Sequence, residues 1–535
     1  MRSLVAFLLG LPLWLVTPAE AADESAPDTK PRVDASTNRK TKVKARSLPS
    51  RAPVRKVADR KPEASGVKPA PIVEGPPDQS QPSKSSNPLD DVAMTPGTIS
   101  SPLQEKPGGL SSLAEGSTEA RRLRVRTEDG SIVVAKVHGA SGDRVSLLLP
   151  DGRIGFSTGR AQAEEPFKPL SADELRESLL REPVFADFKV RQSPHYVVLY
   201  QSTDSFAEES IKLLENLYKN LSDVLRKRGF PVHEPEFPLV AIIFRTERDF
   251  RAYKRIDPDI QAYYEPISNR IAFYQTGEHD KDSPEVATLR KPQTVAHEGT
   301  HQILQNIGIQ PRLSAWPLWL VEGLAEYCSP PTITRKGVAA WGGLGLVNPF
   351  HMATIHDLND TLPMEVKGVA RPQVGRDPKT PLVEYIVTRK ELTPTDYALS
   401  WALTHYLLMK RSNEFLAFLK TMSQIPPLEE RTPEDHLESF RAAFGTELSK
   451  MDKAIGAYLN KLKFDPLPYY AVMFEQPTQG GMIRRAAMVS QSPSVIRQWI
   501  ESISSPQGGP TSWDLIPHPT KARAQLTAEQ WMRNR

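Results

Sequence analysis

The chain has 535 residues, which is enough for two or more domains. Its 68 basic and 64 acidic side chains leave a formal net charge of +4, too small to imply a nucleic-acid partner, and the sequence has no helix-turn-helix, zinc-finger or aromatic RNA-binding motif. The single cysteine, Cys328, excludes an intramolecular disulfide, and we expect it to be a buried, inert thiol rather than a metal ligand.

The first residues have the pattern of a secretory signal peptide. Arg2 precedes an apolar run from Leu4 to Val16, and Ala19-Glu20-Ala21 supplies a cleavage site of the small-x-small type. The run is too short to cross a bilayer, and no later segment is long and apolar enough to do so. We therefore expect a signal peptide over residues 1–21 and a bacterial protein that is secreted or periplasmic, without a transmembrane segment in the mature chain.

Residues 22–118 are rich in Pro, Ser, Lys and Arg and poor in aromatic side chains. Such a segment cannot bury enough apolar surface to offset the entropy lost on ordering, so we expect a disordered linker. Its basic first half suits weak contact with an anionic envelope surface, with a solvated spacer as the alternative.

Residues 119–164 change to short alternating apolar runs. Asp129-Gly130 and Asp151-Gly152 lie between such runs and predict β-hairpin turns. The segment resembles a small SH3-like β-barrel, which implies a docking module rather than a catalytic one.

From residue 165 the chain alternates predicted strands and helices. Apolar runs predict strands over 196–200, 239–244 and 269–274, and leucines at helical spacing predict a helix over 205–228.

The motif Val295-Ala296-His297-Glu298-Gly299-Thr300-His301 is the strongest functional signal. Residues four apart share one face of a helix, so His297 and His301 can present two imidazoles to one metal ion. Glu298 then lies near the open side of the metal, where it can accept a proton from bound water. Pro292 fits the start of this helix and Gly308 its end. The alternative is a core helix whose histidines are satisfied by hydrogen bonds.

A second motif, Trp319-Leu320-Val321-Glu322-Gly323-Leu324-Ala325-Glu326-Tyr327, follows on a helix predicted to start at Pro317. Two His and one Glu leave the fourth tetrahedral position free, as in catalytic zinc sites. Glu322 and Glu326 are four apart, so one can bind metal while the other holds the second nitrogen of a histidine ring. The alternative is a solvated acidic face.

Together the two motifs resemble the gluzincin group of zinc peptidases, in which a His-Glu-x-x-His helix is followed by a helix with a ligand Glu. More narrowly, the second motif is similar to that of bacterial secreted peptidase MA-like proteins, largely of unknown function. The resemblance implies one Zn²⁺ per chain held by His297, His301 and Glu322, with Glu298 as general base and Glu326 supporting a histidine.

The resemblance also implies an α+β fold over residues 165–475, with a gluzincin-like mixed β-sheet subdomain, a helical subdomain and the metal cleft between them. Leu304 and Ile307 exclude a metzincin, which has Gly and His at these places. In gluzincins the strand before the metal helix binds substrate along the cleft edge, and here that strand is Ala272 to Gln275. An interior strand without substrate contact is the alternative.

Later residues carry weaker signals. Tyr397 resembles a gluzincin tyrosine that stabilises the oxyanion, but Ser400 replaces the glycine expected three residues after it, so packing at a helix start is the alternative. We expect His351 and His356 to lie at the cleft rim or surface in a loop-rich stretch. We expect His405 to be a core histidine.

Two helices are predicted over 397–422, and further helices to about 464. We expect residues 476–535 to form a C-terminal tail with one amphipathic helix, over 482–503.

These features predict a secreted zinc metallopeptidase that cleaves a peptide or protein substrate with a water activated by Glu298. Two alternatives stay open: a non-catalytic, zinc-stabilised scaffold or binding protein of the cell envelope, and a zinc amidase acting on cell-wall material.

Overall fold

The computed structural model describes residues 121–127, 130–141, 144–157, 162–256, 260–277, 284–334, 339–359, 369–370, 377, 379–464, 467–505 and 507–534. The predicted signal peptide (1–21) and linker (22–118) lie outside these residues. Within the described ranges, no helix combines the length and apolar character that crossing a membrane requires.

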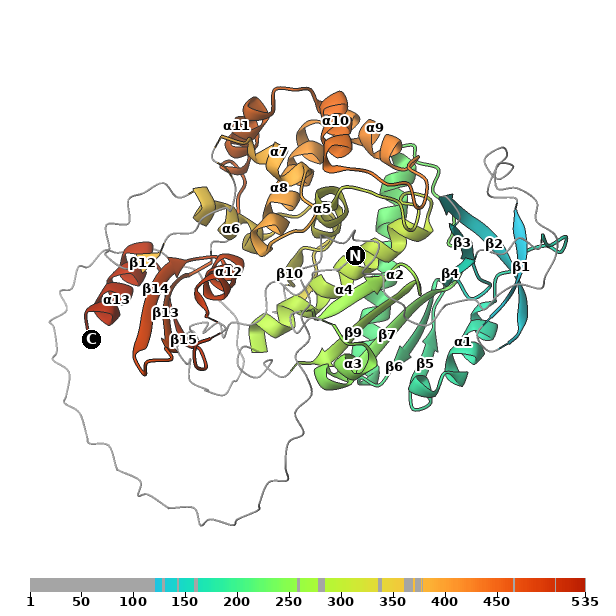
Figure 1. Ribbon diagram of the computed structural model, residues 1–535, viewed down its shortest axis with the longest axis horizontal. Helices are drawn as coiled ribbons and strands as arrows, with labels where there is room; N and C mark the ends of the chain where they lie inside the picture. The colour runs from blue at the N-terminus through green and yellow to red at the C-terminus, as the bar shows by residue number, and fades with distance from the viewer. Residues whose placement is uncertain are drawn as a thin grey trace, which may run out of the picture. The chain divides into compact units, whose positions relative to one another are not determined.

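The first described element is a four-stranded antiparallel sheet. Its strands are β1 (Arg122–Arg126), β2 (Ile132–Ser141), β3 (Arg144–Leu148) and β4 (Ile154–Ser157), in the order β1-β2-β3-β4 (Figure 1). Gly130 and Gly152 adopt φ values of 84° and 82°, the left-handed region that the two Asp-Gly turns need. The described strand pairings do not close this sheet, so the SH3-like barrel stays a prediction.

This small sheet shares a core with the region that follows. Leu148 and Ile154 pack with Phe237 in one buried cluster. The Ile154 amide donates to the carbonyl of Ile267 at 2.7 Å, and the buried Arg312 guanidinium donates to the carbonyl of Gly152 at 2.7 Å.

The central sheet has five strands in the order β5-β6-β7-β9-β8. They are β5 (Lys189–Gln192), β6 (Tyr196–Tyr200), β7 (Leu239–Thr246), β9 (Arg270–Thr276) and β8 (Ala262–Glu265). The three inner strands run parallel, and both edge strands are antiparallel to their neighbours. The strands predicted over 196–200, 239–244 and 269–274 are therefore confirmed as β6, β7 and β9.

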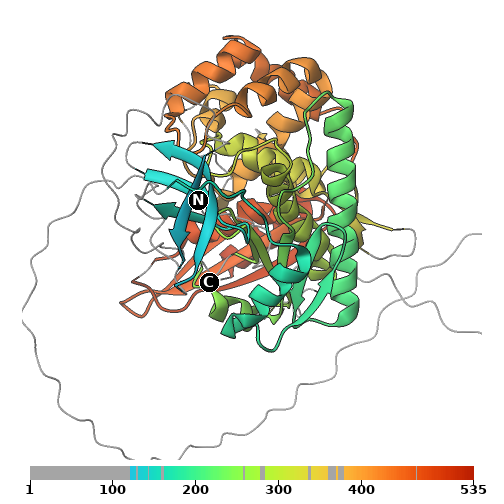
Figure 2. The same cartoon turned by 90° about the vertical axis from the view of Figure 1, so that its right-hand side faces the viewer.

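Both faces of this sheet are covered by other elements. Successive strand residues point to opposite faces, so each strand contributes apolar side chains to two cores. Val197 and Leu199 face a cluster built with α1 (Ala172–Arg181), the short 3₁₀ turn η4 (Pro183–Phe185) and α3 (Glu247–Tyr253). Val198 and Tyr200 face the main core on the other side, to which α2 (Asp204–Lys227) and α4 (Pro284–Asn306) belong. Figure 2 shows α2 as one long helix beside the sheet.

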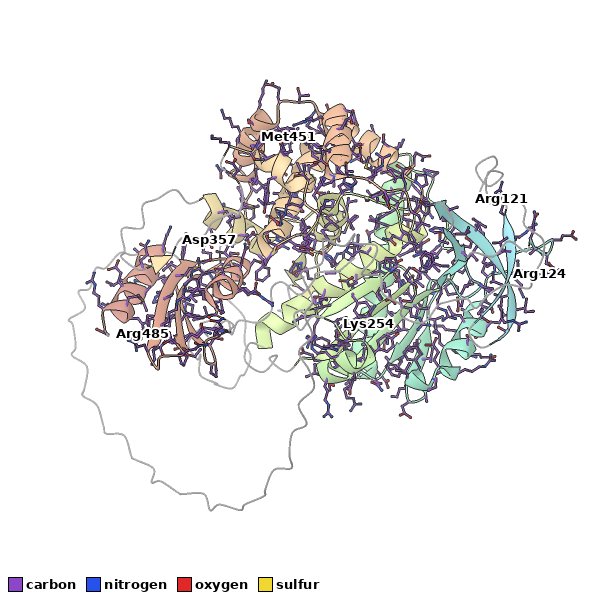
Figure 3. All side chains as sticks on the ribbon, viewed as in Figure 1. Arg121, Arg124, Lys254, Asp357, Met451 and Arg485 are labelled. Carbon is purple, nitrogen blue, oxygen red and sulfur yellow. The ribbon has the colours of Figure 1, made fainter. Side chains whose placement is uncertain are left out.

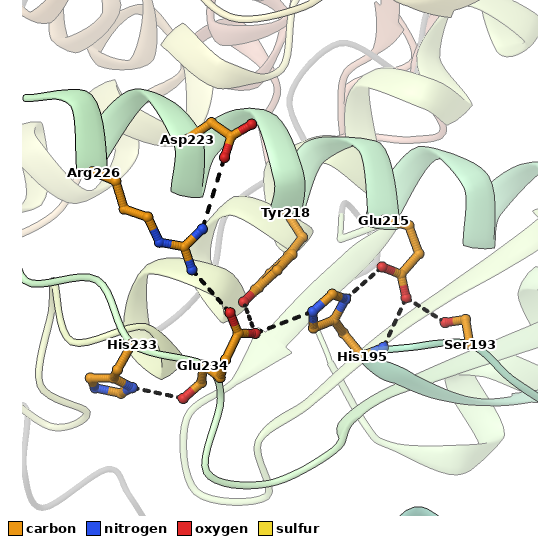
Figure 4. Close-up of polar contacts among 8 residues, drawn as sticks. All are labelled: Ser193, His195, Glu215, Tyr218, Asp223, Arg226, His233 and Glu234. Atoms are coloured by element: carbon orange, nitrogen blue, oxygen red, sulfur yellow. Dashed lines mark hydrogen bonds and ion pairs between the residues drawn. The ribbon is translucent and has the colours of Figure 1, made fainter.

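A polar cluster joins α2 to the strands at its side (Figure 4). The His195 Nδ1 lies 2.6 Å from Glu215 Oε2 of α2, and its ring stacks on Tyr218 with centroids 3.7 Å apart. Ser193 Oγ donates to the other oxygen of Glu215 at 2.6 Å. These contacts fix α2 against the start of β6.

The expectation that Ala272 to Gln275 form the cleft edge is wrong for the first half of that segment. Ala272 and Phe273 are paired on both sides, with β7 and with Tyr263 and Ala262 of β8. The edge is β8, because the chain turns back at Asn269 after β8 and β9 then lies between β8 and β7.

The metal helix starts earlier than its proline signal predicts. It begins at Pro284, and Pro292 lies inside it. Proline has no N–H group, so inside a helix it cannot donate to the carbonyl of the residue four before it. Helix α4 continues past Pro292 without this one hydrogen bond. Its end is as predicted, with Gly308 just beyond it at φ 85°.

A helical region follows, drawn in yellow and orange in Figure 1. It consists of α5 (Leu318–Cys328), the hairpin β10 (Pro331–Ile333) and β11 (Ala339–Trp341), α6 (Pro349–Asn359), α7 (Leu382–Val387), α8 (Pro394–Lys410), α9 (Ser412–Met422), α10 (Pro433–Phe444) and α11 (Leu448–Leu459). The two helices predicted over 397–422, and the further helices to about 464, are confirmed. The mixed sheet and helical region of the expected α+β fold are thus present.

The C-terminal part is more ordered than the predicted tail with one amphipathic helix. A sheet in the order β12-β14-β13-β15 contains β12 (Val369–Ala370), β13 (Tyr469–Pro477), β14 (Ile483–Ser490) and β15 (Ser512–His518), with α12 (Pro493–Ile503) and α13 (Lys521–Arg533) packed on it. The helix predicted over 482–503 is wrong in its first half, which is β14. A short apolar run does not reveal by periodicity alone whether it is strand or helix.

Candidate metal centre

The first motif helix, α4, is fixed to the sheet by buried amides. Gln302 Nε2 donates to the carbonyls of Asn269 at 2.7 Å and Val240 at 3.1 Å. Asn306 and Asn269 exchange two amide hydrogen bonds of 2.8 and 2.9 Å. Because Gln302 directly follows His301 and Asn306 lies five residues beyond it, these bonds set both the axial position and the rotation of the helix.

Glycines bring the two motif helices close to their neighbours. A methyl group on Gly299 would lie 2.7 Å from the Leu214 side chain of α2. One on Gly323 would lie 2.6 Å from the backbone carbonyl oxygen of Ser400 on α8. The glycine in each motif is therefore explained by helix packing.

Three side chains of the two motifs converge in the buried space between α4 and α5. His297 Nε2 lies 3.1 Å from Glu322 Oε2 and 3.1 Å from His301 Nε2. His301 Nε2 lies 3.5 Å from the same oxygen of Glu322. The two nitrogens and one oxygen thus form a nearly equilateral triangle of lone-pair donors, and this group can hold a metal ion.

The charges of these groups support one another. Burial would raise the pKa of Glu322, but His301 and His297 outweigh it and hold that pKa at about 2. Burial would lower the pKa of His297, but Glu326 and Glu322 outweigh it and keep that pKa well above the usual range of histidine. The carboxylate is therefore ionised at neutral pH, as a metal ligand must be, whereas His297 holds a proton that a bound metal ion would displace.

Glu298 is fully buried beside this group. Burial raises the pKa of its carboxyl, and the charges of His297 and His301, together with a weaker backbone hydrogen bond from Tyr264 on β8, partly oppose the shift. Glu298 therefore interacts electrostatically with the three converging side chains and also with the backbone of the edge strand.

Glu326 lies behind His297. Its Oε1 is 3.2 Å from His297 Nδ1, and its Oε2 is 2.8 Å from Nε2 of His351. Gln293 Nε2 donates to the same Oε2 at 3.4 Å. Glu326 is thus buried among two imidazoles and an amide, not on a solvated acidic face.

The contact between His351 and Glu326 was not predicted from the sequence. His351 lies in helix α6 and is buried, so its placement at a cleft rim or surface in a loop is wrong. His356 is exposed as expected, but it lies on the same helix. Asn348-Pro349 is the signal that could have revealed this helix, since an asparagine cap before proline marks a start, and Asn348 Oδ1 accepts from the Phe350 amide at 3.0 Å.

The other predicted residues are placed as follows. Tyr397 is buried in the first turn of α8, the helix that packs on α5 at Gly323. Cys328 is confirmed as a buried thiol, and burial raises its pKa to about 12. His405 is confirmed as a core histidine, with Nδ1 2.8 Å from the Tyr458 hydroxyl and Nε2 3.2 Å from the Gly345 carbonyl.

Residues 291–429 match a family model described as "Protein of unknown function (DUF1570)". The matched stretch is less than half of the chain and contains both motifs, His351 and Tyr397. No curated protein matches the chain. Because the family's description assigns no activity, the chemistry rests on the residues of the site.

Proposed function

We propose that this protein is a zinc-dependent metallopeptidase. The observation that carries the proposal is the buried triangle of His297 Nε2, His301 Nε2 and Glu322 Oε2, with Glu298 beside it. The triangle supplies metal ligands, and Glu298 supplies the proton acceptor that a hydrolytic site needs.

The distances within the triangle fit zinc. Bonds of about 2.0–2.1 Å at tetrahedral angles separate two ligand atoms by about 3.3–3.4 Å, and the three edges here are 3.1, 3.1 and 3.5 Å. Neighbouring ligands of an octahedral Fe²⁺ would be about 3.0 Å apart, close to two of these edges. The buried carboxylate of Glu298 favours zinc, because hydrolysis needs a base at this place and iron oxygenation does not.

The proposed mechanism assigns one role to the metal ion and another to Glu298. Bound zinc would supply a Lewis acid that polarises a carbonyl and makes water reactive at neutral pH. Glu298 accepts the proton of the attacking water and returns it to the leaving amine. Its carboxylate is fully buried, so bulk water does not compete for the proton that it moves.

Two further roles belong to the proposal. The edge strand β8, which among the described strands pairs with β9 alone, binds an extended peptide along the outer edge that remains beside the Tyr264–Glu298 bond, and it takes this role over from Ala272 and Phe273. Tyr397 donates its hydroxyl to the oxyanion of the tetrahedral intermediate. Glu298 supports the first role, because its hydrogen bond from Tyr264 places the base beside β8.

The test is cleavage of a mixed peptide library by the full-length, zinc-loaded protein and by Glu298→Gln. We expect the wild type to cleave peptides and the variant to keep zinc but lose about 10²–10⁴-fold in rate, the usual contribution of a general base.

Three other results would contradict the proposal in distinguishable ways. Full activity in Glu298→Gln would end the general-base assignment. Hydrolysis of cell-wall amides without peptide cleavage would support the amidase. Zinc binding without hydrolysis of either substrate would support the scaffold.

The proposed setting is the bacterial cell envelope. It depends only on the signal-peptide pattern of residues 1–21 and on the basic linker that follows.

A further inference from the structure

We propose that His351 is a positioning residue of the metal centre, which orients His297 through Glu326, and that the C-terminal sheet holds His351 in place through helix α6. The proposal rests on the metal site proposed above and adds to it a support that neither motif contains.

The contacts of Glu326 assign this role to His351. The two oxygens of the carboxylate face different rings: Oε1 faces Nδ1 of His297 at 3.2 Å, and Oε2 faces Nε2 of His351 at 2.8 Å. Of the two ring contacts, the one with His351 is a hydrogen bond and the one with His297 is an ion-pair contact, and the bond from Gln293, at 3.4 Å, is at the long limit of a hydrogen bond. His351 therefore contributes most to the orientation of this carboxylate, whose other oxygen lies at ion-pair distance from Nδ1 of His297.

The ring of His351 is itself held in place. Its centroid lies 5.5 Å from that of Trp401, at an interplanar angle of 34°, and Trp401 is fully buried on α8. A buried imidazole that makes a charge-assisted hydrogen bond is costly to move, because its polar atoms would lose their partners.

The far end of α6 is bound to the loop between β14 and α12. Thr354 Oγ1 lies 2.6 Å from Ser492 Oγ. Oδ2 of Asp357, labelled in Figure 3, accepts from Ser490 Oγ and from the amides of Gln491 and Ser492 at 2.8 and 3.0 Å. One carboxylate oxygen thus receives three donors from the C-terminal part of the chain.

Helix α6 connects the contact of His351 with Glu326 to the contacts of Thr354 and Asp357 with residues 490–492. His351, Thr354 and Asp357 are three residues apart, so they lie on successive turns of one short helix. A shift of α6 that broke the bonds to Ser492 would move His351 away from Glu326. The C-terminal sheet therefore supports the metal centre across α6, although it contributes no ligand to it.

The experiment measures metal binding by full-length protein in four forms: wild type, His351→Leu, His351→Gln and His356→Leu. His356 is the matched control, because it lies on α6 but is exposed and has its ring against Phe464. The readouts are the Kd for zinc, by competition with a chromophoric chelator, and the visible absorption spectrum of the Co²⁺-loaded protein.

We expect His351→Leu to weaken zinc binding about 10–100-fold, as loss of a partner behind a ligand histidine does, and to change the Co²⁺ spectrum. His351→Gln should recover most of the affinity, because its amide can donate to Glu326 Oε2. His356→Leu should behave as the wild type. Asp357→Ala, which frees the far end of α6, should weaken binding in the same direction but less.

Wild-type affinity and spectrum in a folded His351→Leu would overturn the proposal, and the metallopeptidase would stand. Equal losses in His351→Leu and His351→Gln would also overturn it, since helix packing rather than the hydrogen bond would be responsible. Unchanged affinity in Asp357→Ala would overturn the support by the C-terminal sheet. A wild type that binds no metal would overturn this proposal and the proposed function together, whereas metal binding without hydrolysis would overturn only the latter.

Discussion

Buried carboxylates in this protein differ in what they face, and this decides their charge. Glu322 faces two imidazoles, which hold its pKa at about 2. Asp357 accepts its hydrogen bonds from neutral donors, and burial raises its pKa to about 6 although the hydrogen bonds of Ser490, Ser492 and Gln491 and the charge of Lys521 oppose the shift. Neutral donors therefore compensate for the loss of water less completely than charged partners do.

Asp357 gives the protein a pH-dependent stability with a definite sign. Its folded pKa of about 6 lies above the ordinary value of 3.8, so its contribution is full below pH 3.8 and is lost as the pH rises through about 6. A shift of about 2 pKa units corresponds to about 3 kcal/mol. We expect the wild type to lose up to this much unfolding free energy between pH 4 and 7 relative to Asp357→Asn, which keeps an acceptor oxygen and does not titrate.

Urea unfolding of both proteins across this pH range measures the difference. Parallel stability curves for wild type and Asp357→Asn would contradict the assignment.

The candidate ligands could be predicted because helical periodicity is local. His297 and His301 share a face by spacing alone, and the motif containing Glu322 follows on the next helix. The contact between His351 and Glu326 could not be predicted in the same way. It joins residues 25 apart across a hairpin, and no spacing rule connects them.

Helices α4 and α5 each pack closely on a neighbouring helix at a glycine, and the two contacts differ in whether side chains or backbone atoms are the nearest neighbours. At Gly299 the neighbouring atoms are the far ends of the Leu214 and Leu217 side chains, which can shift. At Gly323 they include the backbone of Ser400, which can shift only with α8 as a whole. The position of Glu322 therefore depends on a backbone contact next to it.

These two contacts predict that alanine substitution changes the unfolding free energy differently at Gly323 and at Gly299. Gly323→Ala should lower the unfolding free energy by about 1–3 kcal/mol, the usual cost of overpacking. In Gly299→Ala the leucines can give way, and the better helix propensity of alanine, about 1 kcal/mol, offsets the remainder. Urea unfolding measures both, and an equal or larger cost at Gly299 would contradict the packing described.

Elements with a strong local pattern could be predicted, and elements defined by distant partners could not. The inner strands β6, β7 and β9 are continuous apolar runs, and α2 has leucines at helical spacing. The start of α4 was missed because Pro292 favours a helix start, although the chain accepts it inside the helix. Strand β12 was missed because it pairs with β14 from more than a hundred residues away, and β14 was missed because its apolar residues continue into α12, so that the two together predict one helix.

Across the whole molecule, contacts cross the boundaries 165 and 475 that the sequence suggests for the region containing the candidate metal centre. Before residue 165, Leu148 and Ile154 share a cluster with Phe237. After 475, the loop containing Ser490 and Ser492 binds Asp357, and the cut itself would fall inside β13. Flanking segments thus complete the packing around α4, α5 and α6, so the metal centre has to be measured in the full-length chain.

The most direct measurement is the zinc content of the full-length protein purified without added metal, by elemental analysis. We predict about one zinc per wild-type chain and none in His301→Ala, because two of three protein ligands do not hold the ion. A wild type that contains no metal, and takes up none when zinc is supplied, would contradict the account, since it would mean that the three converging side chains hold one another by hydrogen bonds alone.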